Sequence, residues 1–125
     1  MKLVEFCKER GITVTAYSPL GSGDRPWAKP TDPKLLEDPK IVAIAEKVNR
    51  TPAQVVLNWS IRRGVAVIPK SVTESRILSN FQIFDFSLTD DDMLVLQSFD
   101  GGDKFRSCVL EWVSDHPLYP FHIPF

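Results

Sequence analysis

Residues 65–76 read VAVIPKSVTESR, an unbroken apolar run that ends at Pro69 and passes directly into a polar stretch. A continuous apolar run of this length predicts a parallel strand that is buried on both faces. Lys70 and Ser71 follow at the carboxyl end of this strand, which is where α/β folds bind their ligands. The segment therefore predicts a strand followed by a helix, with a binding site at their junction.

The helix after this strand is predicted from about Thr73 to Asn80, with Ser71 or Thr73 as its cap. Its free N–H groups and the positive end of its dipole attract anions. Lys70 adds a positive charge, Arg76 lies on the same side as Thr73, and Asn80 is one turn further on. The arrangement suits a phosphate, to which arginine donates forked hydrogen bonds. A solvated helix start with an ordinary cap accounts for the same residues, so spacing alone leaves both interpretations open.

A second strand is predicted upstream, over residues 12–17, where β-branched residues are frequent. Tyr17 ends this strand, so both strands direct their carboxyl ends at one site, where an aromatic face can stack on a flat ring. The turn Gly21–Gly23 brings backbone amides and Ser22 close to a ligand, but it is not followed by the Gly-Lys-Ser/Thr of a P-loop. Periodicity alone favours a core position for Tyr17, and Trp27 is either a loop anchor or a pocket wall.

Helical patterns alternate with the two strands. We expect a helix before Gly11, a long proline-rich loop over residues 21–39, and helices over residues 40–47 and from Ala53 to Arg63, the last one opened by Thr51 and Pro52. A further helix follows Thr89. This alternation predicts a parallel α/β fold. Two parallel strands alone leave two bare edges, so the sequence is expected to be the end of a domain whose beginning is absent.

Composition excludes several classes of function. The chain has 125 residues, of which 43% are hydrophobic, and a net charge of −1, so no positive surplus exists for binding nucleic acid. No apolar run approaches the ~20 residues that cross a bilayer. The two cysteines, Cys7 and Cys108, are far apart in the sequence, which favours a reducing compartment, and we expect the cytoplasm.

No metal site is expected. The acidic run Asp90–Asp92 is best interpreted as a complement to a helix dipole. His116 and His122 have no partner at the spacing of metal ligands, and we expect both to lie on the surface of the tail. Trp59 is expected in the core.

Several motifs, in order along essentially the whole chain, resemble the aldo-keto reductases, in particular the aldose and aldehyde reductase branch. Ile68-Pro69-Lys70-Ser71, followed by Arg76, Ser79-Asn80 and Ile83, resembles the family's C-terminal signature. Further segments that resemble this branch are Tyr17 to Ser22, Asp24 to Pro30, Leu36 to Pro39, and Tyr119 to His122.

The resemblance implies a (β/α)8 TIM barrel that binds extended NADPH at the carboxyl ends of its strands and transfers hydride to an aldehyde or ketone. Residues 1–125 would be its C-terminal segment, with the last two strands, their helices and a tail over residues 103–125 that sets substrate specificity. A barrel needs roughly 250 residues, so this segment is incomplete as a stand-alone domain. The full-length enzymes of this branch are mostly monomers.

The resemblance also assigns roles by position. Tyr17 would stack on the nicotinamide, and Asn80 would contact the adenine. The pyrophosphate would be held by Ser18, Leu20, Ser22 and Asp24. The adenosine 2′-phosphate would be held by Lys70, Ser71, Val72, Thr73 and Arg76, of which Lys70 and Arg76 favour NADPH over NADH. The substrate pocket would be lined by Trp27, Cys108 and Leu110.

The sequence departs from the family pattern in three respects. Ser79 stands where aldose reductases usually carry a glutamate, and the tail between Phe105 and His116 differs in length and content. The family's catalytic Asp, Tyr, Lys and His lie in the first half of the barrel, and neither Tyr17 nor Tyr119 replaces the tyrosine, so no catalytic residue is expected here. A catalytically inactive chain that binds nucleotide or a partner, and a nonfunctional fragment, are the alternatives.

Overall fold

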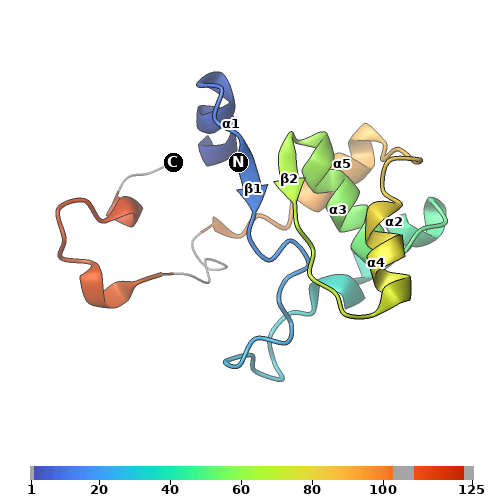
Figure 1. Ribbon diagram of the computed structural model, residues 1–125, viewed down its shortest axis with the longest axis horizontal. Coiled ribbons are helices and arrows are strands. Elements are labelled where there is room, and N and C mark those ends of the chain that lie inside the picture. The colour runs from blue at the N-terminus through green and yellow to red at the C-terminus, as the bar shows by residue number, and fades with distance from the viewer. Residues whose placement is uncertain (1, 103–108, 123–125) are drawn as a thin grey trace.

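The computed structural model describes residues 2–102 and 109–122. Helices and short strands follow one another along the chain (Figure 1). In order, the elements are α1 (Lys2–Glu9), β1 (Val14–Ala16), η1 (Leu35–Glu37), α2 (Pro39–Lys47), α3 (Pro52–Arg62), β2 (Val65–Val67), α4 (Glu74–Phe81), α5 (Asp90–Gln97), η3 (Glu111–Val113) and η4 (Pro120–His122), where η marks a 3-10 helix.

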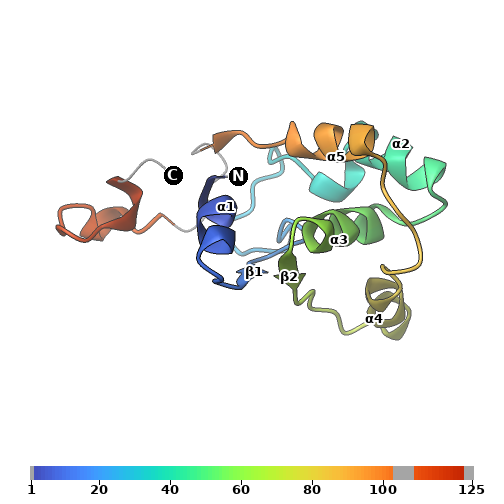
Figure 2. The same ribbon diagram turned by 90° about the horizontal axis from the view of Figure 1, so that it is seen from above.

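The two strands form a parallel pair, as the alternation of strands and helices predicts. Val14 lies opposite Val65, and Ala16 lies opposite Val67. Figure 2 shows α3 beside the strands, with α2 and α5 in a further layer beyond α3. The described chain is therefore an α/β arrangement whose helices cover one side of a short parallel sheet.

The prediction that β2 is buried on both faces is wrong. Val65 is buried, but Ala66 and Val67 are only half-buried, and 74% of the surface of Ile68 is exposed. The reason is that β2 packs mainly against β1 and α3, which leaves the other face of the strand uncovered.

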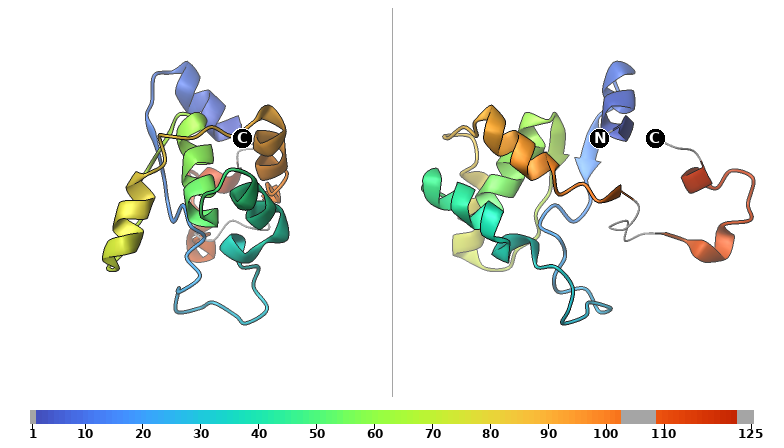
Figure 3. Two further views of the ribbon diagram at one scale, coloured as in Figure 1. Left: turned by 90° about the vertical axis from the view of Figure 1, so that its right-hand side faces the viewer. Right: turned by 180° about the vertical axis from the view of Figure 1, so that it is seen from behind.

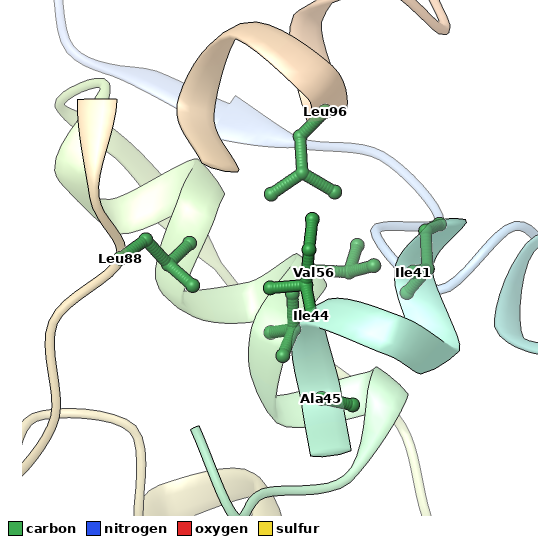
Figure 4. Close-up of a cluster of buried hydrophobic side chains, with 7 residues drawn as sticks. Ile41, Ile44, Ala45, Val56, Leu88 and Leu96 are labelled. Carbon is green, nitrogen blue, oxygen red and sulfur yellow. The ribbon is translucent and has the colours of Figure 1, made fainter. Parts of the chain in front are cut away.

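The main cluster of buried apolar side chains lies between α2, α3 and α5 (Figure 4), while Val65 of β2 is buried outside it. The apolar positions of these helices point toward one another, as their spacing predicts. The central cluster consists of Ile41, Ile44, Ala45, Val55, Val56, Leu88 and Leu96. Trp59, which is expected in the core, packs against this cluster but is only partly buried. The guanidinium of Arg63 lies over its ring, 4.2 Å from the ring centroid.

The helix starts follow the predicted capping motifs. Thr51 caps α3 in a reciprocal capping box with Gln54, and Pro52 is the first helical residue. Thr89 caps α5 in the same way with Asp92. For α2 the prediction is wrong by one residue, since Pro39 belongs to the helix and the side chain of Asp38 caps it by accepting a hydrogen bond of 2.9 Å from the N–H of Lys40.

The tail segment over residues 109–122 forms two short 3-10 helices. Tyr119 is buried there, with the rings of Phe121 and His122 at 5.3 and 4.8 Å from its own. His116 and His122 are exposed, as predicted. Within the described ranges, no group of histidine, cysteine or acidic side chains could hold a metal ion, and no helix is both long and apolar enough to cross a membrane.

Candidate functional site

The predicted cofactor residues follow the carboxyl ends of the two strands. Tyr17 comes directly after β1, and Ile68 and Pro69 separate β2 from Lys70. Because the strands are parallel, the chain leaves both of them at the same edge of the sheet (Figure 1). The fold therefore brings the two predicted segments to one side of the molecule.

Tyr17 is not a core residue, and the interpretation that periodicity favours is wrong. The structure leaves 80% of its surface exposed. The chain turns away from the strand immediately afterwards, at Ser18, whose φ is +50°. The aromatic ring is consequently free to present a face to a flat ligand at this edge.

The loop after Tyr17 has a backbone conformation that side chains rarely adopt. Ser18 and Ser22 have φ values of +50° and +47°, and Gly21 between them has +85°. The N–H of Gly21 donates a hydrogen bond of 2.9 Å to the carbonyl of Ser18, which closes the turn. Non-glycine residues in this region are uncommon, and such strain concentrates at functional sites.

The next part of the loop is held by an arginine that the sequence analysis missed. Arg25 donates a hydrogen bond of 3.2 Å to the carbonyl of Ser22 and forms an ion pair with Asp32. Asp32 also accepts a hydrogen bond of 3.0 Å from the N–H of Lys29. The only sequence signal for the ion pair between Arg25 and Asp32 is that two opposite charges flank a proline-containing segment.

The positive charges after β2 have no partner inside the described part of the chain. Lys70 and Arg76 are exposed there without a hydrogen bond or ion pair from either side chain. Thr73 occupies the cap position of α4 without a capping hydrogen bond, and the hydroxyl of Ser71 instead accepts one of 3.2 Å from the N–H of Thr73. An ordinary side-chain cap is therefore not formed. Two cations adjoin the positive end of this helix dipole, where Glu74 supplies the acidic side chain of the first turn.

Asn80 and Val72 complete the predicted set along α4. Asn80 is half-buried in the last turn, and Val72 is exposed before the helix begins. The helix is attached to α3 by Gln54, whose side-chain amide donates hydrogen bonds of 3.1 and 2.9 Å to the carbonyls of Ser79 and Gln82. The Thr-x-x-Gln motif at residues 51–54 predicts the capping role of Gln54 but not this second role.

The sequence profile of the Aldo/keto reductase family matches residues 1–100. This chain belongs to that family.

Its relatives include aldo-keto reductase family 1 member A1-A of Danio rerio, which is 48% identical, and member A1 of Sus scrofa and of Homo sapiens, at 47% and 44%. Each alignment covers 99% of this chain but 40% of the relative, so the chain spans about two fifths of the length of these relatives. Among solved structures, the apo form of Gox0644 matches with a TM-score of 0.72 at 38% identity, over 84% of this chain and 35% of that one.

The structure has two concave surfaces near the predicted cofactor residues, and neither of them encloses these residues. A polar one of about 530 Å³ lies at the far end of α4, lined by Asn49, Arg50, Thr51, Gln54, Ser79, Gln82 and Asp85. Its charges are already paired, since Arg50 and Asp85 form an ion pair of 2.8 Å. The second concave surface is mostly apolar and has a volume of about 290 Å³. It is lined by Pro19 of the loop after β1 and by residues of η1, α2, α3, α5 and their flanking segments.

The predicted substrate residues are not brought together in the described structure. Trp27 and Leu110 are both exposed and lie in separate segments, the loop after β1 and the tail, and neither lines the two concave surfaces. Cys108 lies outside the described residues, as does part of the predicted specificity tail. The substrate pocket of this family member stays a prediction.

Proposed function

We propose that this chain forms the NADPH-binding part of an aldo/keto reductase that reduces aldehydes and ketones to alcohols. One observation carries the proposal: two unpartnered cations, Lys70 and Arg76, and an uncapped helix start share one edge of the parallel pair with the exposed ring of Tyr17. A phosphate at one end and a flat ring at the other are the two features of a nicotinamide dinucleotide that these residues fit.

Each segment has a defined task in this proposal. Arg76, Lys70 and the first amides of α4 bind the adenosine 2′-phosphate, together with Ser71, Val72 and Thr73. The strained loop holds the pyrophosphate through Ser18, Leu20, Ser22 and Asp24. Tyr17 orients the nicotinamide by stacking, and Asn80 contacts the adenine. NADPH, when bound, supplies the hydride that reduces the carbonyl carbon.

The two strands are proposed to be the last two of a (β/α)8 barrel. No residue of this chain is assigned as the proton donor, and the catalytic groups are proposed to lie in the part of the relatives that the chain does not span. Trp27, Cys108 and Leu110 are proposed to contact the carbonyl substrate. We further propose that the full-length enzyme is a cytoplasmic monomer.

The test is a titration of the chain with NADPH and, separately, with NADH, followed by quenching of tryptophan fluorescence. NADPH is expected to bind more tightly, because only NADPH carries the 2′-phosphate. Replacing Arg76 by Gln removes a charge-assisted contact worth ~1.5–3 kcal/mol, so NADPH affinity is expected to fall about ten- to a hundredfold. NADH affinity is expected to stay the same.

Lys8→Gln is the matched control, since Lys8 is an exposed cation on α1 that has no assigned role. It is expected to leave both affinities unchanged. Circular dichroism of each variant establishes that the chain is folded. Equal affinity of the folded chain for NADPH and NADH would contradict the assignment of Arg76 and Lys70.

A further inference from the structure

The side chain of Gln54 joins the first turn of α3 to the last turn of α4. It is buried, with 5% of its surface exposed. Its oxygen accepts hydrogen bonds from the N–H and the hydroxyl of Thr51, at 2.9 and 3.2 Å. Its nitrogen donates to the carbonyls of Ser79 and Gln82, at 3.1 and 2.9 Å. Both donors and both acceptor sites of this amide are therefore in use.

Helix α4 has few other attachments to the rest of the chain. None of its residues is buried. Within residues 2–102 and 109–122, no other side chain from outside the helix hydrogen-bonds to it. Figure 3, left, shows α4 at the outer flank of the molecule, on the far side of α3 from α2 and α5. The position of α4 therefore depends on the two hydrogen bonds that Gln54 donates.

The two carbonyls that Gln54 binds flank Asn80 in the sequence. Ser79 precedes Asn80 directly, and Gln82 is the residue that ends the helix, two positions later. Carbonyls at the carboxyl end of a helix have no N–H partner further along the helix, and a side-chain donor supplies one. Arg76 lies one turn earlier, so the two hydrogen bonds fix the place of Asn80 more directly than that of Arg76.

We propose that Gln54 is a positioning residue for the nucleotide. By holding the last turn of α4 against α3, it sets the place of Asn80 and, through Asn80, the affinity for the adenosine end of NADPH. Gln54 itself is assigned no contact with the nucleotide. The inference rests on the proposed function, which assigns Asn80 to the adenine.

Two substitutions at Gln54 separate this role from helix capping. Gln54→Glu keeps an oxygen that accepts from Thr51, since glutamate is an ordinary partner in a capping box, but it replaces the donor by an oxygen that repels the two carbonyls. Gln54→Met removes the amide without adding a charge, so it serves if the buried carboxylate of the first variant prevents folding. Circular dichroism establishes which variants are folded.

The experiment is a calorimetric titration of each folded chain with NADPH and with 2′,5′-ADP, which carries the adenosine and the 2′-phosphate but no nicotinamide. Both Gln54 variants are expected to lower both affinities by the same factor, about five- to tenfold, because two hydrogen bonds that order the adenosine end are lost. In a chain that also carries Asn80→Ala, the same substitutions are expected to lower affinity by less than about twofold, because the residue through which Gln54 acts is absent.

Thr89→Ala is the matched control. It removes the side-chain cap of α5, which is a capping box of the same kind as that of α3, and lowers stability without touching α4. It is expected to leave the affinities for NADPH and 2′,5′-ADP unchanged, which distinguishes a positioning role from a general loss of stability.

Each outcome decides for or against the inference. Unchanged affinities in the folded Gln54 variants overturn it, as does a loss that Thr89→Ala reproduces, a loss for NADPH alone, or a loss that persists in full beside Asn80→Ala. In these cases the unsubstituted chain still binds NADPH, so the proposed function stands. If the unsubstituted chain binds neither ligand, the proposed function fails and the role of Gln54 fails with it.

Discussion

At the amino terminus of α5, the carboxylate of Asp92 joins two helices. It accepts hydrogen bonds from the N–H of Thr89, at 2.9 Å, and from the ammonium of Lys47 in α2, at 3.0 Å. Burial acts to raise the pKa of Asp92, but the hydrogen bonds from Thr89 and Lys47 and the charge of Lys47 outweigh it and hold the pKa below its ordinary value. The unfolded chain therefore takes up this proton at a higher pH than the folded chain.

This pKa shift predicts how stability depends on pH. The contribution of Asp92 is fully present above the unfolded pKa of ~3.9 and is lost as the pH falls through the lower pKa of the folded state. Asp92→Asn is expected to lower the free energy of unfolding at pH 7 by about 1–2 kcal/mol and to flatten its decline below about pH 4. Urea unfolding at pH 7 and pH 3 measures both effects.

The control is Asp91→Asn, because Asp91 is exposed in the same helical turn. Its replacement is expected to change the free energy of unfolding by less than about 0.5 kcal/mol. If the two variants were to show the same decline between pH 4 and pH 3, the assignment of the acid transition to Asp92 would be wrong.

At the scale of the element, the loop after β1 depends on one glycine. A Cβ atom on Gly21, whose φ is +85°, would lie 3.2 Å from the Cβ of Leu35, which is tighter than ordinary contact. Gly21→Ala is therefore expected to displace the loop and to weaken NADPH binding about tenfold, through a strain of roughly 1–2 kcal/mol. Fluorescence titration with NADPH measures the change.

Gly23→Ala provides a control in the same turn. A Cβ atom on Gly23 meets nothing within 4 Å, and its backbone does not need the left-handed region. NADPH affinity is expected to stay within about twofold of the unsubstituted chain. An equal loss in both variants would mean that the loop does not act through the conformation of Gly21.

Helix starts were the elements most accessible to prediction, because a cap is a local motif. Thr51 with Pro52, and Thr89 with its acidic turn, mark α3 and α5 within one residue. The sequence does not predict Asp38 as a cap, because the prolines around it indicate a loop, although Pro39 is suited to the first turn of a helix. The contact between Arg25 and Asp32 could not be predicted, since the six residues between them form irregular backbone.

The burial of individual side chains was harder to predict from the sequence than the positions of the helices and strands. The apolar run at β2 and the periodicity around Tyr17 both indicate residues in a core. Instead, Tyr17 and Ile68 are exposed, and of β2 only Val65 is buried. Such patterns are typical of a sheet that is covered on both faces. In the described part of the chain, helices cover only one face. The order of the strands does place Tyr17 and Lys70 at one edge, so the location of the candidate site was predictable while its depth was not.

At the scale of the whole molecule, the core is a helical unit to which the sheet is attached. The seven clustered residues come from α2, α3, α5 and the segment before α5, and none comes from a strand. Native-state hydrogen exchange is expected to give the highest protection in α3, where Val55 and Leu57 are fully buried. Amides of α4 and β1 are expected to exchange at least tenfold faster.

Hydrogen exchange also separates two descriptions of the chain. Equal protection of α3 and α4 would mean that the chain unfolds as one cooperative unit. Higher protection of α3 than of α4 would mean that α4 opens locally while the helical core stays folded.

Helix α4 carries two residues of the proposed cofactor site, Arg76 and Asn80, within eight residues. Its last turn is held by α3, because the side-chain amide of Gln54 donates hydrogen bonds to the carbonyls of Ser79 and Gln82. The helix that bears the proposed phosphate ligand is thus positioned by the helical core and not by the sheet. A substitution that loosens α3 can therefore alter nucleotide affinity without touching the nucleotide.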